Sequence, residues 1–268
     1  MIASQNTTIV LDDGAATTVE RWGDEGPVML CVHGMTSSRK SWTRLAQHYA
    51  SRFRVLAYDQ RGHGDSAAVS GPMTLERGIR DLENVVAAIG GADVLIGHSW
   101  GGAVAIRGGL RVASRAIAGL DPMIVQAGDT WYGEYVEELE ERFKLTGSER
   151  DAATREEYSQ WHPLDVDGKV HAVHSMTAEP IAKLCSENAG ANWDLRYDLA
   201  GYDKPLLLAM AGREGSIVPP DVMEAVGRKH SSCVTIVTFE DQGHNVYRTD
   251  FDAVAGAIDS FLKANQLA

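Results

Sequence analysis

Two features of the sequence predict an α/β fold with a mostly parallel central sheet. Short, continuously apolar segments alternate along the chain with segments of helical periodicity, a pattern typical of parallel strands joined by helices. The apolar segments contain almost no polar positions, so helices should cover both faces of the sheet. A third feature, the charged segment 123–203 without any strand pattern, predicts a helical insertion.

The expected elements can be justified in chain order. Residues 7–11 and 17–22 are expected to be short strands, because an Asp-Asp-Gly turn signal separates them. Residues 28–32 follow a Gly-Pro pair and are apolar throughout, which predicts the first buried strand. Later strands are expected at 54–58, from 94, at 116–120, 205–210 and 234–238, and helices at 41–51, 74–89, 101–112, 220–229 and 250–265.

The alternation of strands and helices stops after Asp121, and residues 123–203 are rich in charged and helix-forming side chains. We expect residues 1–122 and 204–268 to form the core and 123–203 to form a helical cap after strand six. Insertions at the carboxyl ends of parallel strands border the ligand site, so the cap should border it here. Helices within the cap are expected at 131–144, 149–160, 167–176 and 180–187.

Composition excludes several classes of function. The 268 residues can bury one sizeable core, and 25 basic against 37 acidic side chains give a formal net charge of −12, which disfavours nucleic acid as a partner. Residues 1–10 lack the pattern of a secretory signal, and no apolar run could span a membrane, so we expect a cytoplasmic protein. We expect it to be a monomer or a homodimer. Cys31, Cys185 and Cys233 are too far apart to suggest a disulfide framework or a metal site.

The most informative stretch is Gly-His-Ser-Trp-Gly at residues 97–101, which follows an apolar segment and precedes small residues. A sharp turn from strand to helix would expose the hydroxyl of Ser99, and the flanking glycines, Gly97 and Gly101, would avoid collisions there. The N–H of Trp100 would then lie at a helix N-terminus, where negative charge is stabilised. Ser99 is therefore the candidate nucleophile.

A serine nucleophile needs a base and an oxyanion hole. His244 follows the last expected strand and a glycine, which makes it the candidate base, the alternative being an ordinary loop histidine. The loop that begins with His33 and Gly34 follows a buried strand, and Met35 would supply a second oxyanion N–H beside that of Trp100. The alternative for this loop is a simple strand-to-helix connection.

These motifs together resemble those of the α/β-hydrolase superfamily, over essentially the whole chain, and most closely its serine esterases and lactonases. The motifs are His-Gly at 33–34, Asp-Gln-Arg-Gly-His-Gly-Asp-Ser at 59–66, the serine turn at 97–101, and Gly-His at 243–244. The resemblance implies that residues 59–66 form a structural turn, so His63 and Asp65 are assigned no catalytic role. A serine nucleophile also argues against dehalogenases and most epoxide hydrolases of this fold.

The triad acid departs from the family's common pattern. The position after strand seven that usually carries the acid holds Gly215 in this sequence. Glu214 lies one position early, with a longer side chain, whereas Asp121 lies at the tip of strand six, which supplies the acid in some hydrolases of this fold. We favour Asp121 over Glu214, although an aspartate before a proline can simply end a strand.

Aromatic and sulfur-containing side chains are candidates for the wall of the substrate pocket. They could equally form the core of the insertion itself. The candidates, together with the loop residues His33 and Gly34, are Met123, Trp131, Trp161 and Trp193.

The sequence therefore predicts a serine hydrolase that cleaves a small carboxylic ester or lactone without a cofactor or a metal ion. We expect an apolar acyl group rather than a highly charged substrate. Three alternatives stay open: an amide hydrolase similar to proline iminopeptidases, a carbon–carbon bond hydrolase, and a ligand-sensing protein that retains the triad.

Overall fold

The computed structural model describes residues 2–66, 71–125, 130–174, 176–189 and 193–267. An eight-stranded sheet forms the centre of the molecule, with the strand order β1-β2-β4-β3-β5-β6-β7-β8. The first two pairings are antiparallel and the other five are parallel, so the predicted α/β fold is confirmed. The strands are β1 (Ser4–Val10), β2 (Ala16–Trp22), β3 (Val28–Val32), β4 (Arg54–Tyr58), β5 (Val94–His98), β6 (Ala116–Leu120), β7 (Leu206–Ala211) and β8 (Val234–Phe239).

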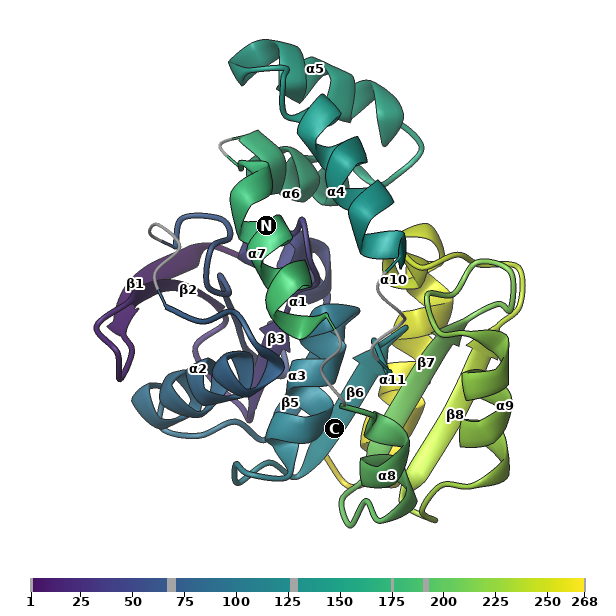
Figure 1. Ribbon diagram of the computed structural model, residues 1–268. Helices are drawn as coiled ribbons and strands as arrows, with labels where there is room; N and C mark the ends of the chain where they lie inside the picture. The colour runs from purple at the N-terminus through teal and green to yellow at the C-terminus, as the bar shows by residue number, and fades with distance from the viewer. Residues whose placement is uncertain (1, 67–70, 126–129, 175, 190–192, 268) are drawn as a thin grey trace.

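Helices cover both faces of this sheet, as Figure 1 shows. Successive residues of a strand point to opposite faces, and in β3 the side chains of Leu30 and Val32 join one apolar cluster while Met29 and Cys31 join the other. The first cluster includes side chains of α2 (Leu75–Ala88), α3 (Trp100–Gly109), α8 (Leu195–Ala200) and α9 (Pro220–Arg228). The second includes those of α1 (Thr43–Tyr49), α10 (Val246–Thr249) and α11 (Phe251–Ala264).

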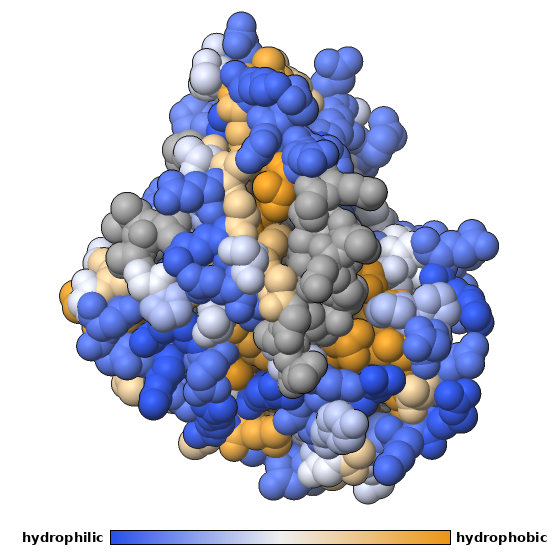
Figure 2. All heavy atoms as spheres, in the orientation of Figure 1, coloured by the Kyte–Doolittle hydropathy of each residue, from blue (hydrophilic) through white to orange (hydrophobic). Residues whose placement is uncertain are grey.

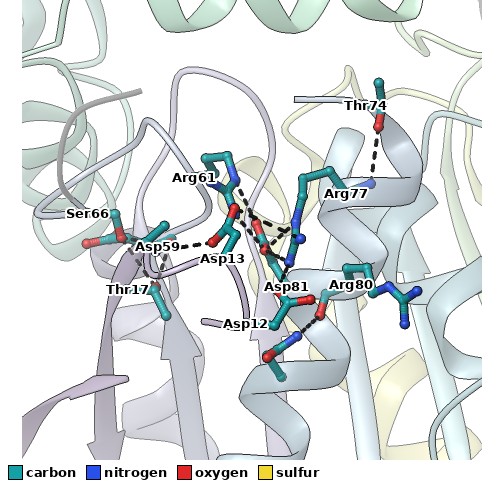
Figure 3. A network of polar contacts seen from close by, with 12 residues as sticks. Asp12, Asp13, Thr17, Asp59, Arg61, Ser66, Thr74, Arg77, Arg80 and Asp81 are labelled. Carbon is teal, nitrogen blue, oxygen red and sulfur yellow. Dashed lines mark hydrogen bonds and ion pairs between the residues drawn. The ribbon is translucent and has the colours of Figure 1, made fainter. Parts of the chain in front are cut away.

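The loop after β4, residues 59–66, is fixed by polar contacts (Figure 3). The backbone oxygen of Asp59 accepts hydrogen bonds from the hydroxyls of Thr17, at 2.6 Å, and Ser66, at 2.8 Å. The guanidinium of Arg61 forms ion pairs with Asp13 at 2.8 Å and with Asp81 on α2 at 2.9 Å. These contacts join the loop to β2, to α2 and to the turn between β1 and β2.

A helical insert follows β6, as predicted, and lies over one end of the sheet in Figure 1. It contains α4 (Thr130–Arg142), α5 (Gly147–Glu157), α6 (Pro163–His174) and α7 (Ala178–Asn188). The side of the insert that faces the viewer in Figure 2 is largely hydrophilic where it is not grey, which fits the charged composition of this segment. Among the described helices, none is both long and apolar enough to cross a membrane.

The insert is held against the core by close backbone packing and by an ion pair. A Cβ atom at Gly168 of α6 would lie 2.7 Å from the backbone oxygen of Lys40, so α6 approaches the short helix η1 (Arg39–Trp42) closely. The guanidinium of Arg44 contacts the carboxylate of Asp165 at 3.1 Å. Helix α6 therefore packs directly on the short helices that follow β3.

Candidate active site

Ser99 occupies a strained turn between β5 and α3. Its backbone has φ 56° and ψ −124°, a conformation that costs a residue with a side chain about 1–3 kcal/mol. A Cβ atom at Gly97 would lie 2.3 Å from the oxygen of Gly101, and a Cβ at Gly101 would lie 2.3 Å from the oxygen of His33. The backbone segments at this turn therefore leave no room for side chains at positions 97 and 101.

Backbone strain is concentrated around this turn. Four described residues other than glycine have a positive φ, and three of them, Thr36, Ser99 and Asp121, lie at the carboxyl ends of the central strands or in the loops that follow. The amide of Asp121 donates to the oxygen of Ala209 at 2.8 Å, while that of Met123 donates to the oxygen of Ser99 at 3.0 Å. Strain that the surrounding structure maintains is typical of functional sites.

Asp121 and His244 form a hydrogen-bonded pair. The Nδ1 atom of His244 lies 2.7 Å from Oδ2 of Asp121, whose side chain is fully buried. The carboxylate also accepts hydrogen bonds from the N–H of Ala211 at 3.0 Å, the hydroxyl of Ser216 at 2.6 Å and the N–H of Ile217 at 3.2 Å. Four donors thus fix the carboxylate, and a carboxylate on Nδ1 orients a histidine with Nε2 free to act as a base.

The alternative acid, Glu214, lies on the exposed part of the loop after β7. No hydrogen bond joins it to His244 in the described part of the chain. At the neighbouring position, a Cβ atom on Gly215 would come within 2.7 Å of the Cα of Gly243 and 2.9 Å of the oxygen of Gln242. The loop that carries the histidine therefore occupies the space that an acid at position 215 would need.

Two backbone N–H groups near Ser99 are free to bind an oxyanion. Trp100 is the first residue of α3, so its N–H has no acceptor within the helix. Neither this N–H nor that of Met35 has a hydrogen-bond partner among the described residues. A Cβ atom at Gly34 would lie 2.8 Å from the Cβ of Ser99, so the loop after β3 passes directly against the serine.

His98, the residue before the serine, is buried beside His244. Their ring centroids are 4.5 Å apart, and Nε2 of His98 lies 2.9 Å from the backbone oxygen of His244. A carbonyl oxygen can only accept, so Nε2 of His98 carries the hydrogen. Burial, and next the neighbouring His244, lower the pKa of His98 well below its usual value. His98 is thus a neutral donor that supports the histidine loop.

Ser99 and His244 line one cavity of about 210 Å³. Of the residues predicted for its wall, Met123 and Trp161 line it, as do Met35 and the two catalytic candidates. The hydroxyl of Ser99 makes no hydrogen bond with any described residue. The remaining lining residues are Thr36, Ser37, His98, Tyr158, Lys169, Ile217, Asn245 and Arg248.

Two other predicted pocket residues have different surroundings, and a third lies where the structure describes only the backbone. His33 is fully buried behind the loop, where its Nε2 accepts from the N–H of Gln60 at 3.0 Å. Trp193 belongs to the apolar cluster under α3, with its ring 6.1 Å from that of Trp100. Trp131 lies in α4, but its side chain is outside the described residues.

Several cavity residues were not identified from the sequence. Lys169 lies in α6, and Tyr158 follows the last residue of α5. Arg248 lies on α10, a helix of four residues that the sequence pattern did not indicate. A lysine or an arginine in a charged helical segment is usually solvated, so nothing local distinguishes these side chains. Among the described residues, no cluster of side chains could hold a metal ion.

A sequence profile of the Alpha/beta hydrolase family matches residues 29–257, and the chain belongs to this family. The chain is 28% identical over 279 residues to a non-heme haloperoxidase of Rhodococcus erythropolis, with 96% of this chain and 99% of that protein covered. It resembles a thermophilic esterase from Thermogutta terrifontis, described as malate-bound, with TM-score 0.76, 24% identity and coverage of 97% of this chain and 99% of that chain. It also resembles the enol-lactonase from Burkholderia xenovorans LB400, with TM-score 0.76, 19% identity and coverage of 96% and 100%.

Proposed function

We propose that this protein is a serine hydrolase that cleaves a small carboxylic ester or lactone through an acyl-enzyme on Ser99. The observation that carries the proposal is the hydrogen bond of 2.7 Å between Asp121 and His244, beside the cavity that Ser99 lines. The fold shared with an esterase and an enol-lactonase agrees with this choice of bond.

In the first half of the reaction, Nε2 of His244 takes the proton of Ser99 as the hydroxyl oxygen attacks the carbonyl carbon. The N–H groups of Met35 and Trp100 would bind the oxyanion of the tetrahedral intermediate. When the carbon–oxygen bond to the leaving alcohol breaks, His244 gives its proton to that alcohol. Asp121 keeps the imidazole in one tautomer and stabilises the imidazolium.

In the second half, His244 takes a proton from water as the water oxygen attacks the acyl carbon. The bond to Ser99 then breaks, and the serine oxygen recovers the proton from His244. The products are a carboxylic acid and free enzyme, so the cycle needs no cofactor.

The same residues would serve an amide hydrolase or a carbon–carbon bond hydrolase. The charge of the cavity argues against an amide hydrolase of the iminopeptidase type. A peptidase that removes N-terminal residues must bind a substrate ammonium, which requires a carboxylate. No aspartate or glutamate is found among the described lining residues, whereas Lys169 and Arg248 both line the cavity.

The test is a panel of short-chain esters, lactones and aminoacyl amides, measured with wild type and Ser99→Ala. Many turnovers on esters or lactones, abolished by Ser99→Ala, support the proposal. Hydrolysis that survives this substitution unchanged would exclude Ser99 as nucleophile. A single slow acylation, accompanied by a change in the stability of the insert, would favour a ligand sensor over an enzyme.

A further inference from the structure

Two cationic side chains lie in the cavity beside the candidate triad. Lys169 on α6 is 8% exposed and Arg248 on α10 is 5% exposed. Neither forms an ion pair with a described carboxylate, although the protein as a whole is acidic. Burying a cation without a counterion is costly, so two such groups in one small cavity require an explanation.

Among the described residues, the guanidinium of Arg248 has only neutral partners. Nη1 donates to the side-chain oxygen of Asn245 at 2.5 Å, Nη2 donates to the hydroxyl of Ser37 at 3.2 Å, and Nε is buried without a hydrogen-bond partner. The group also lies over the rings of Trp161 and Tyr247, at 4.9 and 4.8 Å from their centroids. At least one N–H of a fixed, planar donor group is therefore unused.

The ammonium of Lys169 is also bound only by neutral groups in the part of the chain that the structure describes. Its Nζ donates to the backbone oxygen of Thr36 at 3.0 Å and lies 3.3 Å from the Thr36 hydroxyl. The Tyr158 ring centroid is 5.5 Å from the same nitrogen. An ammonium has three donors, so at least one of them is left for a further acceptor.

The nearby carboxylates have other partners. Asp165 is close enough to Arg248 for that charge to affect its pKa, but its carboxylate contacts Arg44 at 3.1 Å. Glu157, which acts on the pKa of Lys169, contacts Arg142 at 3.1 Å. Neither of these two carboxylates therefore forms a direct ion pair with Lys169 or Arg248.

We propose that Lys169 and Arg248 form an anion-binding subsite, so that the preferred ester or lactone carries a second, free carboxylate. The proposal rests on the function proposed above and narrows its substrate class. The planar guanidinium suits a planar carboxylate, and the ammonium supplies an adjacent point charge. This subsite departs from the apolar acyl group that the sequence led us to expect.

The substrate test compares monoethyl succinate, which is an anion, with diethyl succinate, which is its neutral counterpart. Wild type should prefer the monoester, and Lys169→Met or Arg248→Gln should each reduce the ratio of the two kcat/KM values about ten- to hundredfold, since a hydrogen bond to a charged group contributes about that much. Lys169 also holds the loop beside Met35, but damage to that loop would affect both esters and leave their ratio unchanged.

Matched controls remove the same charges outside the cavity. Lys144→Met removes an exposed lysine after α4, and Arg228→Gln removes an exposed arginine at the end of α9. Both should leave the ratio unchanged. An equal change of the ratio in these controls would show that only the net charge of the protein matters, and would overturn the subsite.

A binding test separates the subsite from the catalytic proposal. Calorimetry on Ser99→Ala, which cannot form the acyl-enzyme, should detect monoethyl succinate or the monoethyl ester of malonate or glutarate. Affinity should fall about ten- to hundredfold when Lys169→Met or Arg248→Gln is added. If none of these monoesters binds, or if the additions change nothing, the subsite is wrong even where ester hydrolysis by wild type is established.

The pH dependence of this binding provides an independent readout. Burial, and next the charge of Arg248, lower the pKa of Lys169 to about 7; Arg142 also lowers it and Glu157 opposes this. Burial raises the pKa of Tyr158, so that phenol stays neutral in this range. An anion binds the protonated lysine, so affinity should be full below the pKa of Lys169 and fall by up to about tenfold per pH unit above it.

His244 also lines the cavity and is present both with Lys169 and in Lys169→Met. Affinity is therefore measured against pH for Ser99→Ala and for Ser99→Ala with Lys169→Met. The difference between these two pH profiles gives the contribution of Lys169. Identical profiles with and without Lys169 would contradict the proposal.

Discussion

The two sides of the cavity are stabilised in different ways. At the sheet edge, Ser99 and Asp121 are held in strained conformations by backbone hydrogen bonds from adjacent strands and loops. On the opposite side, the insert has a small described apolar cluster, formed by Leu139, Met176, Ile181 and Cys185, against the two large clusters of the sheet. The sheet edge is therefore fixed by the core, whereas the insert depends more on individual polar side chains.

Among the described residues of the insert, Arg150 makes the most extensive of these polar links. Its guanidinium donates to five backbone oxygens, at distances between 2.7 and 3.3 Å, which belong to the segment between α4 and α5, to the last two residues of α6 and to Met176. A single side chain thus replaces part of an apolar core. In the function proposed above, the sheet edge would determine the chemistry, and the insert, with α10, would determine which substrate enters.

The largest expected effect tests the sheet edge. Asp121→Asn should lower kcat on an activated ester about ten-thousand-fold, because an amide cannot hold His244 in the required tautomer or stabilise its charged form. Glu214→Gln should change kcat little, since Glu214 is exposed and no hydrogen bond or ion pair between described residues joins it to the histidine. Steady-state kinetics on one ester, with circular dichroism as a check of folding, compares the two variants.

The reverse ranking of these two variants would assign the acid to Glu214 and place the functional carboxylate on the loop after β7. The crowding at Gly215 adds a sharper test. Gly215→Asp should not restore activity to Asp121→Asn, because the new side chain would collide with the loop that carries His244. Restored activity would show that this loop moves aside more easily than its contacts indicate.

The second effect concerns the insert. Arg150→Met should destabilise it locally by about 3–5 kcal/mol, because several buried carbonyl oxygens lose their donor at once. Hydrogen exchange should therefore become faster in α4, α5 and α6, whereas β5 and β6 stay protected. Activity should fall because Tyr158 and Lys169 no longer border the cavity.

Arg155→Met is the matched control, since Arg155 is exposed on α5 and, within the described part of the chain, forms an ion pair with Asp167 alone. It should change neither the exchange nor the activity measurably. If Arg150→Met increased exchange equally in the sheet and the insert, the two regions would unfold as one unit. The contrast between them would then not hold.

The same contrast explains what could be predicted from the sequence. The fold was predictable because a continuous apolar run such as residues 28–32 predicts both a strand and its burial on both faces. The serine turn was recognisable because its steric requirement for Gly97 and Gly101 is local. The cationic residues were not, because Lys169 and Arg248 become neighbours only when α6 packs on η1 and a four-residue helix follows the histidine loop.

The choice between Asp121 and Glu214 shows an intermediate case. The sequence supplied both carboxylates and a reason to doubt the usual position, but the observations that favour Asp121 are tertiary. They are the donors from β7 and the following loop that surround Asp121, and the histidine loop that crowds Gly215. Neither is encoded in a local pattern.

The smallest expected effect concerns Ser216, which links the loop after β7 to the proposed acid. Its hydroxyl donates to Oδ1 of Asp121 at 2.6 Å and accepts from the N–H of Val218 at 3.0 Å. The N–H groups of Ala211 and Ile217 remain on the carboxylate when this hydroxyl is removed. Ser216 is therefore a positioning residue, whose loss should weaken the orientation of the carboxylate without removing it.

Ser216→Ala should lower kcat about tenfold and leave KM nearly unchanged, because one of several hydrogen bonds to a charged group is lost while the cavity wall is intact. Ser216→Thr keeps the hydroxyl and should recover most of the activity, whereas Ser260→Ala, on the exposed side of α11, should have no effect. A rise in KM without a fall in kcat would mean that the loop after β7 contributes to substrate binding. Substrate selection would then be shared by the sheet edge and the insert rather than divided between them.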